Sequence, residues 1–421
     1  MHPKALLEAA AELVGQVLKF DHPADAIVSR FFREHRSLGP RERATLAETA
    51  YGVLRRKLLY EHLAPSGSGS KERRLAILGF AAPRDFLAAA LSPQEKDWLA
   101  NCDAVKPADL LERHRHNLPE WLVQPLKAQL GDEFWPLVDA LNQPAPLDLR
   151  VNALTDKRED VQHELELAGL RAVPTSYSPW GLRLDDKPAL TRLDAFARGA
   201  IEVQDEGSQL LALLLDAKRG QMVVDFCAGA GGKTLALGAA MRNTGRLYAF
   251  DVSAHRLEAL KPRLARSKLS NVHPAAIAHE RDERVKRLAG KIDRVIVDAP
   301  CSGLGTLRRN PDLKWRQTPQ GVVELVAKQG AILQSAARLL KPGGRLVYAT
   351  CSILPQENEG VAEAFSAANP AFRPVPARLA LELAKVVDPG QLCSADGGYL
   401  RLWPHRHATD GFFAAIWERE A

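Results

Sequence analysis

Two of the five cysteines stand where a thiol could act as a nucleophile. Cys301 lies in the run DAPCSG at 298–303 and Cys351 in the run TCS at 350–352, each after a short apolar segment predicted to be a strand. A single cysteine after a strand is more often a small core residue. Two such cysteines favour covalent catalysis, in which a neighbouring positive charge helps because a free thiol has a pKa of about 8.5.

A glycine-rich run follows an earlier predicted strand. The segment 222–226 leads directly into CAGAGGKT at 227–234, after which a helical apolar pattern begins. Glycines let the backbone approach a ligand closely, and a helix N-terminus offers free N–H donors to a carboxylate or phosphate. Asp251, at the end of the next predicted strand, is placed to accept hydrogen bonds from a ribose diol. Together these features predict a site for an adenosine-containing ligand.

Two other nucleotide-binding motifs compete for this run. Residues 232–234 match the end of a P-loop, but the first glycine of that motif would fall at Cys227. A dinucleotide fingerprint counted from Gly229 would place Thr234 at its third glycine. Each alternative therefore lacks one defining residue. The glycine run with its flanking aspartates suits S-adenosylmethionine better, and an ATPase remains the more distant alternative.

The predicted strands that carry these residues alternate with helices along the chain. After residue 221, amphipathic helices separate short apolar strands at 222–226, 247–250, 294–297 and 346–349. This alternation predicts an α/β fold with a parallel sheet covered by helices on both faces. Such sheets bind ligands at the carboxyl ends of their strands. We therefore expect the glycine run, Asp251 and both cysteines to share one site.

We assign residues 216–421 to a catalytic domain. Two further regions precede it. Apolar side chains recur at helical spacing over 6–18 and 46–58, which predicts an all-helical domain over residues 1–140. Alternating strands and one helical stretch predict a small α+β module over 141–215. The helical domain is rich in arginines that form either a solvated face or an RNA surface: Arg30, Arg33, Arg36, Arg41, Arg43, Arg55 and Arg56.

Composition limits the class of protein. The length of 421 residues suggests two or three domains. The aliphatic run 210–215 is far shorter than the roughly 20 residues of a membrane span, and the N-terminal residues show no signal-type pattern. Five cysteines without CxxC spacing argue against disulfides and zinc, and a net charge of +6 is compatible with nucleic acid. We expect a cytoplasmic monomer that binds neither a membrane nor a metal.

Five motifs occur together in the C-terminal half: CAGAGGKT, DAPCSG, TCS, RRNPDLKW at 308–315 and DGFF at 410–413. In combination they resemble the RNA cytosine-5 methyltransferases of the RsmB/NOP2/Sun family. The resemblance implies a Rossmann-like class I methyltransferase domain preceded by an RRM-like α+β module. The N-terminal segment is similar to the NusB-like domain of RsmB-type enzymes, which implies 16S ribosomal RNA as the substrate.

The thiols fit this reaction. Carbon 5 of cytosine is too poor a nucleophile to take a methyl group unaided, but thiolate addition at carbon 6 makes it enamine-like. The resemblance implies that Cys351 attacks and that Cys301 helps release the product. Lys233 is a source of positive potential, and Asp298 is placed to hold the base. The resemblance also implies that S-adenosylmethionine contacts Cys227, Ala228, Gly229, Ala230, Gly231, Gly232, Lys233, Asp251 and Asp298.

Two other functions stay open. A transfer-RNA cytosine-5 methyltransferase would have the same catalytic half, and only the N-terminal domain favours ribosomal RNA. A noncatalytic RNA-binding assembly factor would retain the fold but has no use for the pair Cys301 and Cys351. In either enzyme the basic segment 308–315 is where we expect an RNA phosphate to pass. The base that removes the carbon-5 proton and the residue that contacts adenine stay unassigned.

Overall fold

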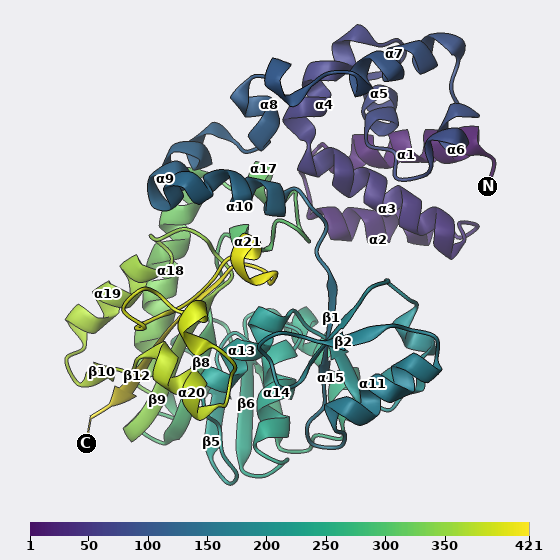
Figure 1. Cartoon of the computed structure of the whole chain (residues 1–421). Helices are drawn as coiled ribbons and strands as arrows, with labels where there is room; N and C mark the ends of the chain where they lie inside the picture. The colour runs from purple at the N-terminus through teal and green to yellow at the C-terminus, as the bar shows by residue number, and fades with distance from the viewer. Residues whose placement is uncertain (421) are drawn as a thin grey trace. The chain divides into compact units, whose positions relative to one another are not determined.

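The computed structural model describes residues 1–420, which divide into two units (Figure 1). Unit 1 contains Met1–Pro144 together with Thr306–Pro319, and unit 2 contains Ala145–Gly305 and the chain from Gln320 onward. Within the described residues, no helix combines the length and the apolar character that a membrane crossing requires. The predicted division into three domains remains a proposal.

Unit 1 is helical, as its apolar spacing predicts. Its helices are α1 Pro3–Val17, α2 Ala24–Glu34, α3 Pro40–Arg55, α4 Lys57–Leu63, α5 Lys71–Leu78, α6 Arg84–Ala88, α7 Pro93–Asp103, α8 Glu112–His116, α9 Glu120–Leu130, α10 Phe134–Leu141 and α17 Leu313–Arg316. Leu6, Leu13 and Val17 recur on one face of α1 and are buried where this helix packs against α3 and α5. A capping box between Ser92 and Glu95 begins α7.

The segment 306–319 is held in unit 1 by hydrogen bonds to the end of α3. Trp315 packs against the helical core, and its Nε1 donates to the backbone oxygen of Leu54 at 2.8 Å. The neighbouring Lys314 donates from Nζ to the backbone oxygen of Arg55 at 2.8 Å. A segment that interrupts unit 2 in the sequence therefore completes the core of unit 1.

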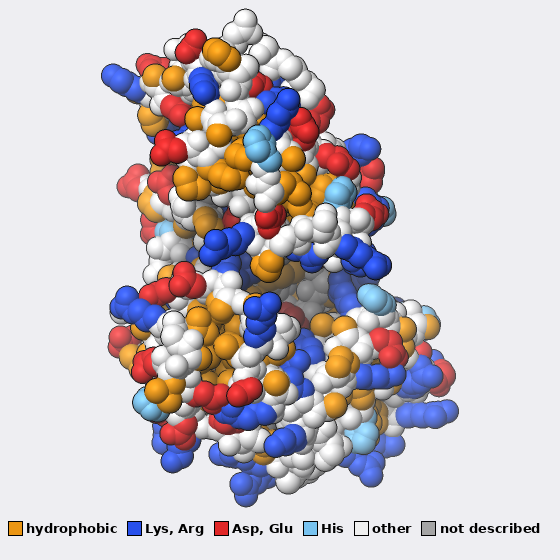
Figure 2. Space-filling model, turned by 90° about the vertical axis from the view of Figure 1, so that its right-hand side faces the viewer, with side chains coloured by type: hydrophobic (Ala, Val, Ile, Leu, Met, Phe, Trp, Pro, Cys, Tyr) orange, Lys and Arg blue, Asp and Glu red, His pale blue; other side chains and the backbone are white. Residues whose placement is uncertain are grey.

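Burial corrects the expectation for the basic side chains of this segment. Arg308 and Lys314 are only 6% and 2% exposed, so the prediction that they meet an RNA phosphate is wrong for these two. Arg55 is buried as well, and its guanidinium donates to the backbone oxygen of Arg308 at 3.1 Å. The exposed arginines of this region are Arg30, Arg33, Arg36, Arg41 and Arg56. On the face shown in Figure 2, Lys and Arg are spread among Asp and Glu.

The first part of unit 2 is a β-α-β-β-α-β module. Its elements are β1 Leu147–Val151, α11 Arg158–Leu167, β2 Ala172–Pro174, β3 Gly181–Leu184, α12 Asp194–Ala197 and β4 Ile201–Val203. The sheet is antiparallel, in the order β2-β3-β1-β4. Leu149 and Val151 pack in the module's own core, whereas the alternate residues Asp148 and Arg150 are buried on the other face. There the backbone nitrogen of Glu206, the first residue of α13 (Glu206–Leu214), donates to Asp148 Oδ2. That face is covered within unit 2 and is no open platform for RNA.

The second part of unit 2 is built on a larger sheet with the strand order β10-β12-β9-β8-β5-β6-β7, and β11 pairs with β12. The strands are β5 Met222–Asp225, β6 Arg246–Asp251, β7 Val272–Ala276, β8 Ile292–Asp298, β9 Leu340–Thr350, β10 Phe372–Pro374, β11 Leu400–Leu402 and β12 Phe412–Arg419. Strands β5 to β9 run parallel, as predicted. The sheet is mixed rather than wholly parallel, because β12 runs antiparallel to β9 and to β11. The connection from β11 to β12 contains only the short α21 (Pro404–His407), which is too short for the crossover that a parallel pair needs.

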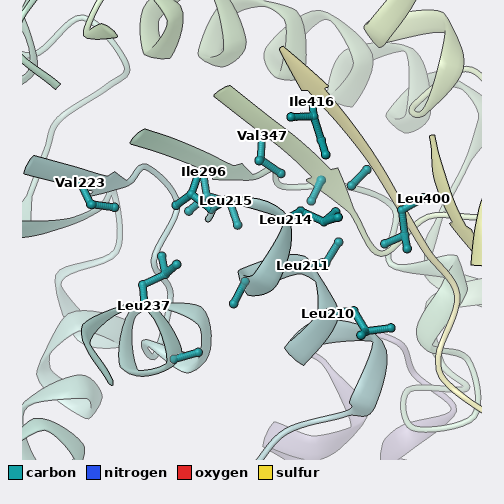
Figure 3. Packing of buried hydrophobic residues seen from close by; sticks show 14 of the residues in the cluster. Leu210, Leu211, Leu214, Leu215, Val223, Leu237, Ile296, Val347, Leu400 and Ile416 are labelled. Carbon is teal, nitrogen blue, oxygen red and sulfur yellow. The ribbon is translucent and has the colours of Figure 1, made fainter. Parts of the chain in front are cut away.

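Apolar side chains join this sheet to its helices on both faces. The remaining helices are α14 Gly232–Ala240, α15 Ala254–Ser267, α16 Glu283–Lys286, α18 Pro319–Ala337, α19 Glu359–Ala368 and α20 Ala377–Leu383. In one of the two cores, Leu211 and Leu214 of α13 pack with Val223, Ile296 and Val347 from three neighbouring strands (Figure 3). The aliphatic run at 210–215 is therefore a buried helix face.

The direction in which strands are added to the sheet reverses between β5 and β8. The sheet grows from β5 through β6 and β7 on one side, and through β8 and β9 on the other. The loops that follow β5 and β8 diverge at such a point and leave a crevice at the carboxyl ends of the strands. The glycine run and both cysteines follow strands that end at this crevice.

Candidate active site

A cavity of about 940 Å³ lies in unit 2 at the carboxyl ends of the parallel strands. Its walls come from the loops after β5, β6, β7, β8 and β9, from α18, and from the start of α13 with the residues before it. All of the predicted site residues except Gly231 line it: Cys227, Ala228, Gly229, Ala230, Gly232, Lys233, Asp251, Asp298, Cys301 and Cys351. The structure thus brings the predicted cofactor and thiol residues into one cavity.

The glycine run turns sharply between β5 and α14. Gly231 has a φ of 86°, and a Cβ there would lie 2.1 Å from Leu260 Cδ1, so a side chain at this position would be strained as well as blocked. Gly229 donates from its backbone nitrogen to Asp251 Oδ2 at 2.8 Å, and Ser253 donates to Oδ1 at 2.7 Å. Asp251 therefore braces the loop in addition to facing the cavity.

Asp225 offers an unused acceptor at the end of β5. Its Oδ2 accepts a hydrogen bond from Thr234 Oγ1 at 2.7 Å, whereas its Oδ1 is buried without a partner among the described residues. Burial raises the pKa of Asp225 to about 7. An orphaned carboxylate oxygen that lines a cavity suits a ligand carrying a positively charged donor. The residues present therefore fit S-adenosylmethionine, which carries an ammonium group.

Lys233 is a fixed cation at the start of α14. Its Nζ donates to Asp298 Oδ2 at 2.6 Å and to Ser208 Oγ at 3.1 Å. Burial by itself would lower the pKa of Lys233, but its attraction to Asp298 and their hydrogen bond, with Asp225 and Cys351 nearby, raise the pKa above its ordinary value. Lys233 therefore stays charged beside the thiol of Cys351.

Ser208 and Gln204 are cavity residues to which the sequence analysis assigned no role. Gln204, in the connection between β4 and α13, donates from Nε2 to Ser208 Oγ in the first turn of α13 at 3.1 Å, and both residues line the cavity. Gln204 in turn accepts a hydrogen bond from the buried Arg150 of β1 at 2.6 Å. The chain just after β4 thus reaches the site and is braced by the small module, and no local sequence pattern signals this.

The two thiols meet where β8 and β9 end side by side. Cys301 Sγ and Cys351 Sγ are 3.3 Å apart, and both cysteines are free and partly exposed. The hydrogen bond with Cys351, followed by burial, raises the pKa of the Cys301 thiol well above its usual value. Cys301 is therefore a protonated thiol at neutral pH, in contact with the sulfur of Cys351.

Close backbone packing against Gly305 and Gly411 holds the loop that carries Cys351. Gly305 donates from its backbone nitrogen to Cys351 O at 2.8 Å, and Gly411 donates to Gly305 O at 2.8 Å. A Cβ on Gly305 would lie 2.1 Å from the backbone oxygen of Gly411, so only glycine allows this approach. The glycine of the DGFF motif thus supports the thiol loop. Among residues 1–420 no group of three or more His, Cys, Asp or Glu is arranged to hold a metal ion.

The strand order with its antiparallel β12, together with the glycine run and Asp251, defines a Rossmann-like methyltransferase. Residues 212–418 match the family described as 16S rRNA methyltransferase RsmB/F, and residues 118–191 match the ferredoxin-like domain of RsmF/B-like methyltransferases. The chain belongs to the RsmB/F family of ribosomal RNA methyltransferases. This membership confirms the predicted fold class, the α+β module and S-adenosylmethionine as cofactor, and it excludes the ATPase alternative.

Individual relatives agree with this assignment. The chain is 33% identical to the probable ribosomal RNA small subunit methyltransferase B of Synechocystis, over 94% of this chain and 95% of the relative. It is 29% identical to the ribosomal RNA small subunit methyltransferase B of Vibrio cholerae, over 98% and 97% of the two chains. Among solved structures, a methyltransferase homologue from Pyrococcus horikoshii is 28% identical and covers 75% of this chain and 100% of its own, with a TM-score of 0.64.

Proposed function

We propose that this chain methylates carbon 5 of a cytosine in 16S ribosomal RNA through a covalent adduct between Cys351 and carbon 6. The observation that carries the proposal is the pair of thiols, 3.3 Å apart, in the cavity that also contains the glycine run. Methyl transfer to a nitrogen or a hydroxyl oxygen needs no thiol nucleophile, because those atoms carry lone pairs. Transfer to carbon 5 of a pyrimidine does need one.

Four features of the cavity are suited to hold S-adenosylmethionine. Asp251 would accept hydrogen bonds from the ribose hydroxyls, and Asp225 Oδ1 would accept from the ammonium group. The backbone N–H groups of the glycine run and the N-terminus of α14 would receive the carboxylate. When bound, the cofactor supplies an electrophilic methyl group on a sulfonium.

Cys351 would attack as a thiolate. Its sulfur lone pair forms the bond to carbon 6, and the ring electrons displaced by this addition make carbon 5 enamine-like. The ammonium of Lys233 supplies a positive charge near the attacking sulfur. Asp298 accepts from Lys233 through Oδ2, and its carboxylate would hold the amino or ring-nitrogen edge of the base.

Cys301 would act after methylation. Removal of the carbon-5 proton by a base lets the carbon 6–sulfur bond break, and the bonding electrons return to Cys351 as a thiolate. A protonated thiol 3.3 Å away can hydrogen-bond to that leaving sulfur and ease its departure. This supports the division of roles that the family resemblance implies, with Cys351 as nucleophile and Cys301 as the group that resolves the adduct.

Bisulfite sequencing of 16S ribosomal RNA tests the proposed function. A strain that lacks the gene should lose the bisulfite resistance of one cytosine, the wild-type gene should restore it, and a gene encoding Cys351→Ala should not. Transfer RNA from the same strains serves as the internal comparison. A loss confined to transfer RNA would assign the other substrate, and unchanged cytosines in both RNAs would contradict cytosine-5 methylation.

A further inference from the structure

One buried carboxylate connects the two loops that carry the thiols. Glu357 is 0% exposed, and its Oε2 accepts hydrogen bonds from Ser302 Oγ and Ser352 Oγ, both at 2.5 Å. These serines immediately follow Cys301 and Cys351. The other oxygen, Oε1, accepts from the backbone nitrogen of Ser302 at 2.8 Å. A single side chain thus ties together the residues next to both sulfurs.

A second set of contacts fixes the position of this carboxylate. Gln329 of α18 donates from Nε2 to Glu357 Oε1 and to the backbone oxygen of Pro300, both at 3.0 Å. Tyr348 of β9 donates from its hydroxyl to the backbone oxygen of Glu357 at 2.6 Å. Pro300 directly precedes Cys301. The first thiol loop is therefore held on both sides of its sulfur by groups that meet at Glu357.

The chemistry of this cluster is unusual for a structural core. The donors to the Glu357 carboxylate are neutral groups: two hydroxyls, one peptide N–H and one amide. Burying a carboxylate is unfavourable unless it is fully hydrogen-bonded, so an apolar side chain would serve simple packing at least as well. A carboxylate offers instead several acceptor sites in one plane, which can set the positions of several donors at once.

We infer that Glu357 is a positioning residue that, through Ser302 and Ser352, fixes the two thiol loops so that the sulfurs of Cys301 and Cys351 stay in contact. The inference rests on the proposed function and deepens it. The role is indirect, because Glu357 does not line the cavity. With the loops fixed, the attacking sulfur and the thiol that assists its departure occupy set positions before RNA arrives.

Charge gives this arrangement a second effect. The hydrogen bond with Cys351 and burial raise the pKa of the Cys301 thiol, and the negative charge of Glu357 adds to the rise. Tyr348 is a further titratable group that interacts with Cys301. Glu357 thereby helps to keep Cys301 protonated and able to donate a hydrogen bond.

The test compares Glu357→Gln with Glu206→Gln. Glu206 is a matched control, because it is a buried carboxylate of unit 2 that accepts from neutral backbone donors, those of Tyr177 and Ser178. Single-turnover methyl transfer at saturating RNA and S-adenosylmethionine should fall about 100-fold in Glu357→Gln, since displacement of reacting groups by about 1 Å has effects of this order. Cofactor affinity by calorimetry should stay within about twofold in both variants. The control should retain its rate.

A thiol titration separates positioning from folding. In the Cys351→Ala background, the pH midpoint for alkylation of Cys301 by iodoacetamide, followed by mass spectrometry, should move to lower pH when Glu357 is also replaced by Gln. A general loss of structure would abolish cofactor binding instead. An unchanged midpoint, or an unchanged methyl-transfer rate in Glu357→Gln, would overturn the inference.

A second variant keeps the carboxylate and removes its hydroxyl donors. Replacing Ser302 and Ser352 together by Ala should lower the methyl-transfer rate about tenfold, and full activity of this double variant would also count against the inference. The wild-type protein distinguishes the two proposals. If wild type transfers no methyl group to RNA, the proposed function fails, whereas an active wild type with an active Glu357→Gln refutes the role of Glu357 alone.

Discussion

Two buried lysines, one in each unit, have opposite electrostatic surroundings. Lys233 is paired with Asp298 at 2.6 Å, and this attraction outweighs burial and raises its pKa. Lys314 donates to the backbone oxygen of Arg55 and lies near that residue's guanidinium, so burial and the like charge lower its pKa to about 7. A neighbouring carboxylate therefore decides whether a buried lysine stays charged at neutral pH or readily loses its proton. The first is suited to chemistry and the second to packing.

The largest effect that we expect lies beside Lys233. Cys351→Ala should abolish both methyl transfer and any covalent complex, because no atom remains to add to carbon 6. Cys301→Ala should still form the adduct but release it slowly, so that enzyme accumulates on RNA. Denaturing electrophoresis with labelled RNA and cofactor would show a shifted band for Cys301→Ala alone. The reverse pattern would exchange the roles of the two thiols.

Replacing each lysine by methionine tests the comparison directly. Lys233→Met should lower the single-turnover rate by about 10² to 10³-fold, the range found when one preorganised charge or donor is removed from an active site. Lys314→Met should leave the chemical step within about threefold, because its ammonium lies within unit 1, against the backbone oxygen of Arg55 and the ring of Trp315. Equal losses of rate in the two variants would mean that burial rather than the carboxylate partner decides the role.

Asp251→Ala should weaken S-adenosylmethionine binding by about 1.5 to 3 kcal/mol, which is the usual contribution of a charge-assisted hydrogen bond. The loss has two sources, because Asp251 also accepts from the backbone of Gly229 and holds the glycine loop. Asp251→Asn, which keeps one acceptor oxygen, should lose less. Calorimetry measures both variants, and an affinity equal to wild type in Asp251→Ala would remove this residue from the cofactor site.

The smallest effect concerns stability and pH. Because the pKa of Lys314 is about 7 in the folded protein and about 10.4 in an unfolded chain, the unfolded state binds more protons between these values. The contribution of Lys314 to the free energy of unfolding therefore rises from pH 7 to pH 10 and is flat below pH 7. Lys314→Met should stabilise the protein by about 1 kcal/mol at pH 7 and remove this slope. Urea titrations from pH 6 to pH 9 measure both changes.

Local sequence patterns predicted the parts of the site that lie on contiguous runs. The glycine run, Asp251 and both cysteines follow strand ends, and the alternation of strands and helices was enough to place them at one edge of the sheet. The pairing of Lys233 with Asp298 and the role that we propose for Glu357 could not be predicted from the sequence, because their partners come from other helices and strands. The burial of Lys314 and Arg308 could not be predicted either. A run of basic residues is normally expected on the surface, and only the tertiary structure shows the partners that bury it.

The segment 306–319 makes unit 1 discontinuous along the chain, and this has a consequence for synthesis. Trp315 follows its acceptor Leu54 by 261 residues, so the first helices leave the ribosome long before the segment that completes their core. Until then, the apolar surface that receives Trp315 stays uncovered. The chain also crosses between the units three times, at 144/145, 305/306 and 319/320. A single proteolytic cut after 305 or after 319 therefore leaves the two units covalently joined through 144/145. A cut after 144 leaves them joined through the segment 306–319, which stays packed in unit 1.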